Sequence, residues 1–226
     1  MMSMLDRPVW TSLSTSHSAL SVGNALARRY APDVNLFASA CDDTLQALAA
    51  LADLVRAGEQ VFVLQVPEIV VPAPLVAVKE AKGVQMMATR NTTALGHEGM
   101  LRLTDADAPE MLALAKLTEP GPFLTRTHTM GTFIGVRIGG RLAAMAGERF
   151  RFPGYTEVSG VCTHPDFRGR GLARQLSAVV AAGIEARGER PFLHAWKTNP
   201  PAIALYESLG FEIRNEVNVA VLERRP

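Results

Sequence analysis

The residues best suited to chemistry lie in a glycine-rich loop, Arg168-Gly169-Arg170-Gly171-Leu172-Ala173. The apolar, β-branched segment Val158–Thr163 before it predicts a buried strand, which Pro165 ends because proline donates no ladder hydrogen bond. After the loop, apolar residues recur every three or four positions from Leu172 to Ile184, which predicts a helix that ends near Gly188. Free backbone N–H groups at the start of such a helix, beside two arginines, are suited to binding phosphate or pyrophosphate.

A Gly-x-Gly loop alone fits an ordinary strand-to-helix turn with solvated arginines about equally well. Two other phosphate-binding loops fit badly. A P-loop needs Gly-Lys-Ser/Thr where the chain has Gly171-Leu172-Ala173, and a dinucleotide fingerprint needs a third glycine where it has Arg174. The loop matches the acyl-CoA signature Q/R-x-x-G-x-G/A through Arg168, Gly171 and Ala173. In this loop the chain resembles the GNAT superfamily of N-acetyltransferases.

A second segment, Asn199–Phe211, strengthens the resemblance. Its sequence N-P-P-A-I-A-L-Y-E-S-L-G-F is similar to the family's second motif, an asparagine, a helix with a tyrosine, and Gly-Phe. The elements predicted from Met100 onward follow the family's order, β-α-β-β-β-α-β-α-β. The resemblance covers residues 100–226 and implies an α/β (α+β) GNAT-type fold, with a mixed, mostly antiparallel sheet flanked by helices.

Composition limits the function classes. The chain has 226 residues, 48% of them hydrophobic and 20% charged, which is typical of a globular protein of one large or two small domains. A formal net charge of +1 argues against a nucleic-acid partner. No signal core and no run of 18 apolar residues occurs, so we expect a soluble cytoplasmic protein without membrane contact. Cys41 and Cys162 are expected to be buried free thiols, and no spacing indicates a metal site.

The polar segment Asn91–Gly99 predicts a boundary between an N-terminal α/β domain, residues 1–96, and an acetyltransferase domain, residues 97–226. The first domain carries no reactive constellation and could be a degenerate half-copy of the same fold. Helices are predicted there over Ser18–Tyr30 and Leu75–Ala81. The apolar final strand, Phe211–Leu222, could pair with a second subunit and form a homodimer.

The resemblance also implies how the co-substrate acetyl-CoA is held. The loop residues Arg168, Gly169, Arg170, Gly171, Leu172 and Ala173 would bind its pyrophosphate. Its pantetheine arm would pair with the backbone of Val161, Cys162 and Thr163, in a slot between this strand and Phe192–Trp196, with Gly160 at the bend. Asn199 would bind the arm, cap its helix, or do both.

Acid–base roles are assigned to two residues. The resemblance implies that Tyr206 is the general acid for the leaving thiolate, because a phenol is protonated at neutral pH. Glu157 is the candidate general base, with a raised pKa at the entry of its strand. Glu148 is its rival, since two facing carboxylates would raise one pKa. His128 and His194 are weaker candidates, and Cys162 is expected to fill space rather than act as a nucleophile.

The predicted function is therefore direct transfer of an acetyl group from acetyl-CoA to the primary amine of a small molecule. Two alternatives stay open. One is transfer of a longer or aromatic acyl group to a glycine-type acceptor, and the other is an acyl-CoA sensor without catalysis. Neither the acceptor amine nor the protein's preference for acyl-chain length can be deduced from the sequence.

Overall fold

The computed structural model describes residues 3–92 and 99–225. The α-helices are α1 (Pro8–Ser14), α2 (Leu45–Asp53), α3 (Ala108–Thr118), α4 (Leu172–Ala186) and α5 (Pro200–Ser208). The strands are β1 (Ser21–Gly23), β2 (Ala27–Tyr30), β3 (Ala38–Ala40), β4 (Gln60–Gln65), β5 (Leu75–Ala88), β6 (Met100–Arg102), β7 (Phe133–Ile138), β8 (Arg141–Phe152), β9 (Tyr155–Thr163), β10 (Arg190–Trp196) and β11 (Phe211–Arg224). None of these helices is long and apolar enough to cross a membrane.

The strands form two sheets. β1, β2 and β3 make a small antiparallel sheet, and the other strands make an eight-stranded sheet in the order β4-β11-β5-β10-β9-β8-β7-β6. β9 and β10 run parallel, whereas the other neighbours in the larger sheet are antiparallel. This mixed, mostly antiparallel sheet with a small N-terminal sheet confirms the predicted fold class.

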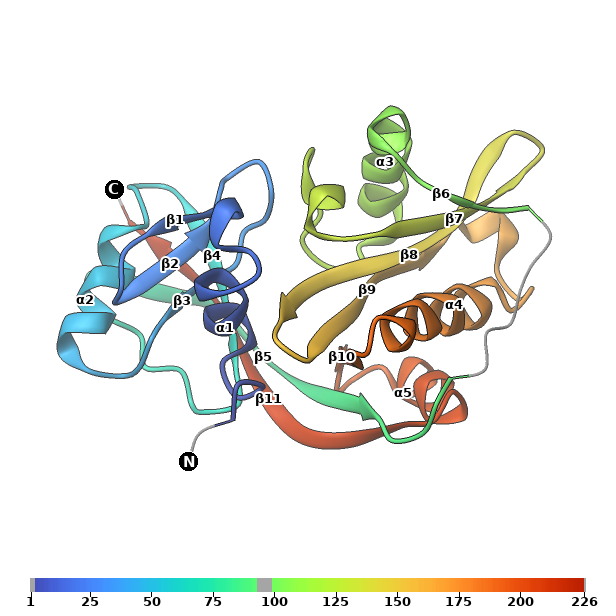
Figure 1. Cartoon of the computed structure of the whole chain (residues 1–226). Coiled ribbons are helices and arrows are strands. Elements are labelled where there is room, and N and C mark those ends of the chain that lie inside the picture. Colours follow the sequence, from blue (N-terminus) through green and yellow to red (C-terminus); the bar gives the residue numbers. More distant parts are fainter. Residues whose placement is uncertain (1–2, 93–98, 226) are drawn as a thin grey trace.

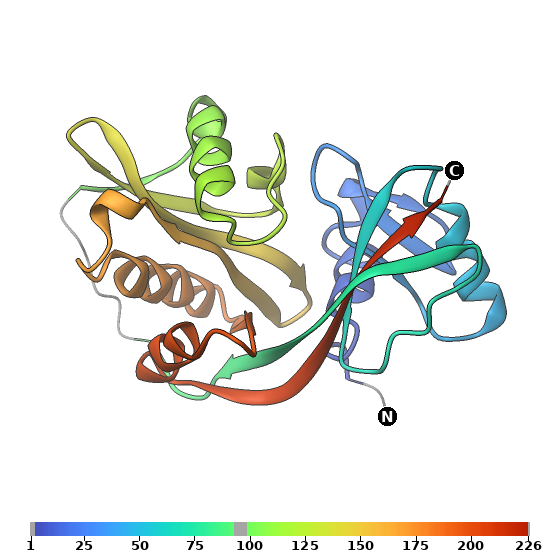
Figure 2. The ribbon, with the colours of Figure 1, turned by 180° about the vertical axis from the view of Figure 1, so that it is seen from behind.

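Two long strands join two lobes (Figure 1). The N-terminal lobe, residues 3–74, contains α1, α2 and β1 to β4, and the C-terminal lobe, residues 99–210, contains α3 to α5 and β6 to β10. β5 and β11 are each 14 residues long, pair with each other and run from one lobe into the other, as the reverse view also shows (Figure 2). The two lobes therefore share one continuous sheet.

The predicted domain boundary at residues 96–97 lies outside the described residues. β5 precedes this point in the sequence, yet it lies between β10 and β11, which both follow it. The N-terminal part of the chain thus supplies a central strand of the larger sheet as well as its edge strand β4.

Helices cover both faces of the sheet in the C-terminal lobe (Figure 1). Successive residues of β8 point to opposite faces, as strand geometry requires. Ala144 and Ala146 pack in the same cluster as Leu176 of α4. Met145 packs instead with Met111 of α3. β8 is therefore covered on both faces.

The predicted helix over Ser18–Tyr30 is wrong, because Ser18–Leu20 form a short 3-10 turn and Ser21–Tyr30 form the hairpin of β1 and β2. The side-chain oxygen of Asn24 accepts hydrogen bonds from the N–H groups of Leu26 and Ala27, at 2.8 and 3.1 Å, and stabilises a turn instead of a helix. The predicted helix over Leu75–Ala81 is also wrong. That segment belongs to β5 because β11 pairs with it along its length.

The final strand β11 pairs with β5 along its length, whereas β4 occupies its other edge only over Asn218–Glu223. Among the described residues, the second edge of Phe211–Val217 has no strand partner, so a homodimer through this strand stays a prediction. The outermost strands of the eight-stranded sheet are β4 and β6.

Candidate active site

A gap between two central strands forms the candidate active site. β9 and β10 pair only from Tyr155 and Arg190 to Glu157 and Phe192. Beyond that point β9 keeps its pairing with β8, and β10 keeps its pairing with β5. The two strands therefore separate, in agreement with the slot predicted between them.

Gly160 lies where β9 bends. From Ser159 to Cys162, β9 has one residue more than the facing segment Met145–Gly147 of β8, which makes a β-bulge. Gly160 has a φ angle of +62°, and a Cβ added there would lie 2.9 Å from the ring of Phe133. Backbone conformation and lack of space therefore both require glycine.

The slot opens into a cleft of about 750 Å³ that residues of both lobes line. Arg149 and His194 line it, and Phe37 and Phe62 contribute a wall from the N-terminal lobe. Tyr206 and every residue predicted to bind the donor also line this cleft: Val161, Cys162, Thr163, Arg168, Gly169, Arg170, Gly171, Leu172, Ala173 and Asn199. The predicted site residues that line this cleft span 45 positions of the sequence, from Val161 to Tyr206.

The glycine-rich loop leads into α4 with an open backbone. Gly169 and Gly171 have φ angles of +76° and +73°, which favour glycine, and no atom of the described residues lies within 4 Å of a Cβ added at Gly169. The N–H groups of Gly169, Arg170 and Gly171 have no acceptor among residues 3–92 and 99–225. Exposed donors at the start of a 15-residue helix are suited to an anionic phosphate.

Two side chains at the end of β9 bear on the chemistry. The hydroxyl of Thr163 is buried and has no hydrogen-bond partner in the described part of the chain, so it is available to a polar group in the slot. Cys162 is a buried free thiol, and burial raises its pKa to about 11. A thiol that stays protonated is a poor nucleophile, which supports the prediction that Cys162 fills space.

Tyr206 and Asn199 enter the site from α5. Tyr206 is partly buried and packs edge-to-face on Phe211 with ring centroids 6.2 Å apart. Burial, and then the negative charge of Glu157, raise the pKa of Tyr206 to about 12, so its phenol is protonated at neutral pH. The side-chain oxygen of Asn199 accepts a hydrogen bond from the N–H of Ala202 at 3.2 Å, so Asn199 caps α5.

Glu157 has no exposed surface and does not line the cleft. Its carboxylate accepts hydrogen bonds from Arg149 Nε at 2.7 Å, from Arg149 Nη2 at 2.6 Å, from His194 Nδ1 at 2.7 Å and from the backbone N–H of Phe150 at 3.3 Å. Burial acts to raise its pKa, but Arg149, through its charge and hydrogen bonds, and His194 together lower it to about 2. The prediction of a raised pKa is therefore wrong.

A second bulge explains these contacts. Glu148 lies opposite Val158, and Arg151 lies opposite Thr156. The two residues between Glu148 and Arg151 therefore face the single residue Glu157. This arrangement releases the N–H of Phe150 from the ladder and directs both it and the guanidinium of Arg149 to the buried carboxylate.

The rival base Glu148 does not face Glu157. Its carboxylate is buried and accepts a hydrogen bond from Arg187 Nη2 at 2.9 Å. The expected pair of facing carboxylates is absent from the described strands, because Val158 is the residue opposite Glu148. Glu148 is therefore an ion-pair partner at the end of α4 and does not line the cleft.

Both ring nitrogens of His194 are engaged. Gln85 Oε1 accepts from Arg214, and Gln85 Nε2 donates to the carbonyl of Leu5 at 2.9 Å, which fixes the orientation of this amide. The same Nε2 lies 3.1 Å from His194 Nε2 and must donate to it. His194 therefore carries its proton on Nδ1, donates it to Glu157, and has no free nitrogen for an acceptor amine.

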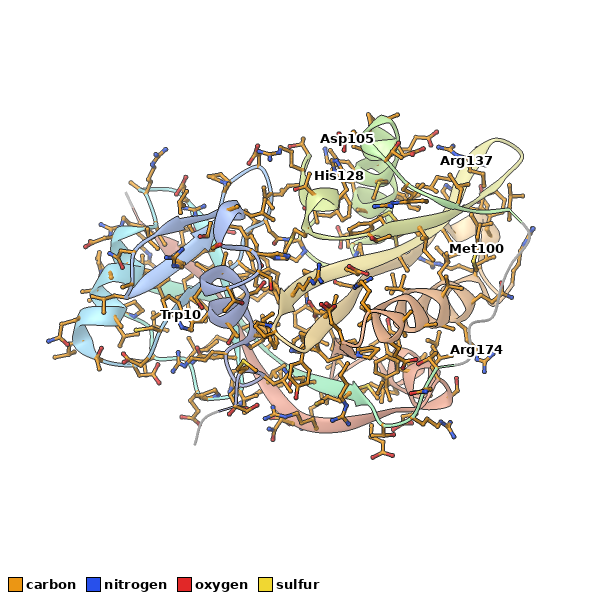
Figure 3. The ribbon with its side chains drawn as sticks, in the orientation of Figure 1. Trp10, Met100, Asp105, His128, Arg137 and Arg174 are labelled. Carbon is orange, nitrogen blue, oxygen red and sulfur yellow. The ribbon has the colours of Figure 1, made fainter. Side chains whose placement is uncertain are left out.

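His128 lies elsewhere. Its Nε2 is 3.0 Å from Oδ1 of Asp105 in the 3-10 turn before α3, and Figure 3 shows the two side chains beside each other. Neither residue lines the cleft. His128 is thus not positioned to act on a substrate in the slot.

Among the cleft side chains that sequence reasoning missed are Arg149, Phe37 and Phe62. Arg149 stands in the alternating run Arg149-Phe150-Arg151-Phe152, which resembles an ordinary strand with solvated charges. Its burial depends on the bulge opposite Glu157, which has no signature in this run. The two phenylalanines reach the site only through long-range packing of the lobes.

Comparison with known proteins supports one family. The family model of the FR47-like proteins matches residues 133–220. A solved structure from Novosphingobium aromaticivorans, assigned to the acetyltransferases of the GNAT family, is 43% identical over 100% of both chains, with a TM-score of 0.94. A GCN5-related N-acetyltransferase from Kribbella flavida shares the fold, with 16% identity, 98% and 96% of the two chains covered and a TM-score of 0.66. No curated protein matches the chain significantly.

Proposed function

Because the chain belongs to the GNAT family of acetyltransferases, we propose that it transfers an acetyl group from acetyl-CoA directly to the primary amine of a small molecule. The observation that carries the proposal is the slot between β9 and β10, with an open phosphate-type loop and Tyr206 lining the same cleft. Acetyl-CoA supplies the acetyl group as an activated thioester. The residues of the chain then have to bind it, orient it and move protons.

Binding is assigned to the backbone. The N–H groups of Gly169, Arg170 and Gly171 and the dipole of α4 bind the pyrophosphate, and Arg168 adds positive charge from its exposed position. Beyond Glu157, the edge of β9 that faces the slot has no partner among the described strands, so its backbone is available to the amides of the pantetheine arm. The unpartnered hydroxyl of Thr163 lies beside this edge.

Tyr206 is assigned the transfer of a proton to the leaving thiolate. Its phenol donates a proton to the thiolate that is released when the carbon–sulfur bond breaks, and it recovers a proton from solvent. Cys162 takes no part, since its thiol is protonated and direct transfer needs no enzyme nucleophile.

Glu157 receives a different role from the predicted base. Its carboxylate is ionised at neutral pH and already accepts four hydrogen bonds, so it has little capacity to take a proton. We assign it to positioning Arg149 and His194. The acceptor amine therefore loses its proton to water and attacks the thioester carbonyl in its neutral form. As the carbon–nitrogen bond forms and the carbon–sulfur bond breaks, the attacking nitrogen releases its second proton to water.

The test measures CoA release from acetyl-CoA with a broad panel of amines, and donor binding by calorimetry. Gly171→Glu is expected to abolish donor binding because it places a negative charge in the phosphate loop. Gly188→Glu is the matched control, since Gly188 has a similar φ of +76°, also has open space around it, and lies at the other end of α4. Equal donor binding by both variants would refute the loop assignment, and donor binding without turnover on any amine would favour a sensor.

A further inference from the structure

The guanidinium of Arg149 has donors that the protein does not use. Arginine carries five N–H donors in one plane. Glu157 accepts from Nε and from one N–H of Nη2. Nη1 and the second N–H of Nη2 have no acceptor within residues 3–92 and 99–225, and the side chain, 12% exposed, lines the cleft. An edge with two adjacent, outward donors therefore remains for a ligand.

This edge is held rigidly. The guanidinium carbon of Arg149 lies 4.9 Å from the ring centroid of Phe37 and 4.4 Å from that of Phe150. Aromatic contacts cover the guanidinium plane, while Glu157 fixes its rotation through two parallel hydrogen bonds. The free edge is thus already ordered before a ligand arrives, and its geometry matches the two oxygens of a carboxylate.

The surroundings of this edge are apolar. Phe37 packs edge-to-face on Phe62 with ring centroids 5.7 Å apart, and Leu64, Val217 and Val219 line the same cleft. A ligand bound to Arg149 would therefore place its remaining atoms against aromatic and aliphatic side chains. A cationic chain, such as a polyamine or a lysine-rich peptide, would meet only donors at Arg149.

We propose that the acceptor is an amino acid with an apolar side chain, which binds its carboxylate to the free edge of Arg149 and its side chain to the wall formed by Phe37 and Phe62. This inference rests on the proposed function and names the substrate class of the same site. It also gives the N-terminal lobe a role, because both phenylalanines come from it.

The experiment compares acceptors that differ in one group, with the intact enzyme and saturating acetyl-CoA. Phenylalanine, phenylalaninamide and phenethylamine share a side chain, but only the first has a carboxylate. After correction for the fraction of neutral amine, kcat/KM for the free acid should exceed both others at least about tenfold, because hydrogen bonds to a charged group are the strong ones. Leucine should also be preferred to serine, because only leucine can bury an apolar side chain on the wall.

The possible results distinguish failure of this inference from failure of the proposed function. Acetylation of phenethylamine or phenylalaninamide as efficient as that of phenylalanine would overturn this inference and leave the proposed function intact. Acetyl-CoA binding without acetylation of any amine in the panel would overturn the proposed function and this inference with it.

A substitution of Arg149 tests whether this residue causes the preference for acceptors with a free carboxylate. Arg149→Lys keeps the positive charge near Glu157 but loses the two-donor edge, so kcat/KM for phenylalanine should fall at least about tenfold while that for phenethylamine changes little. Arg151→Lys is the matched control, since Arg151 lies on the same strand, pairs with Glu189 and does not line the cleft. Thermal unfolding and donor affinity show whether each variant is folded. An Arg149→Lys variant that is folded and keeps the full preference for the free acid would refute the role of Arg149.

Discussion

Replacing Glu157 by glutamine removes a buried charge and keeps the size of the side chain. In the folded chain the pKa of Glu157 is about 2, against an ordinary value of 4.5. Each pKa unit corresponds to about 1.4 kcal/mol, so the ionised carboxylate stabilises the fold by about 3 kcal/mol at neutral pH. We therefore expect Glu157→Gln to lower the melting temperature by roughly 6–12 °C, at about 2–4 °C per kcal/mol for a chain of this size.

The pH dependence of this loss of stability shows whether the ionised carboxylate of Glu157 causes it. Because the folded-state pKa lies below the unfolded one, the stabilisation is present above pH 4.5 and is lost as the pH falls towards 2. The difference in unfolding free energy between wild type and Glu157→Gln, measured by urea denaturation, should shrink to about half or less by pH 3. Glu80→Gln on the exposed part of β5 is the control and should show no such difference. A gap between wild type and Glu157→Gln that stays constant from pH 7 to pH 3 would refute the reasoning.

Three further predictions address the chemistry and the slot. Tyr206→Phe should lower kcat about 100-fold or more and leave donor affinity unchanged, as calorimetry can check; unchanged turnover would remove its acid role. The pH midpoint of kcat/KM should follow the amine pKa of each acceptor, because Glu157 and His194 are both engaged; a midpoint common to all acceptors would point to a base in the protein. Gly160→Ala should cost about 2 kcal/mol or more in thermal unfolding, through its φ of +62° and the contact with Phe133, and wild-type stability would contradict the required bulge.

Much of the C-terminal lobe follows from local signals. Gly139 and Gly140 have φ angles of +58° and +80° in the hairpin turn between β7 and β8, as a two-residue turn requires. Asn199 caps α5, and Gly210, with a φ of +90°, follows its end. Each signal acts over a few residues, so the sequence alone is sufficient to predict it.

The N-terminal lobe and the polarity of the site depend on distant contacts. Leu75–Ala81 is extended because β11, more than 100 residues later, pairs with it. Phe37 and Phe62 line the cleft only because the long strands bring the two lobes together. None of these contacts has a periodic pattern in the sequence.

Glu157 shows most clearly how environment decides the role of a residue. Burial alone would raise the pKa of its carboxyl group, as the sequence analysis expects for a base. The bulge in β8 places Arg149 opposite, and its charge and two hydrogen bonds reverse the direction of the shift. The same bidentate contact uses two of the five guanidinium donors of Arg149. It leaves the edge formed by Nη1 and Nη2 free for a ligand in the cleft. In our proposal, the interaction that argues against Glu157 as a base also orders Arg149 for an acceptor carboxylate. A loss of acid preference in Arg149→Lys and a loss of the pH-dependent stability in Glu157→Gln would then have one structural origin.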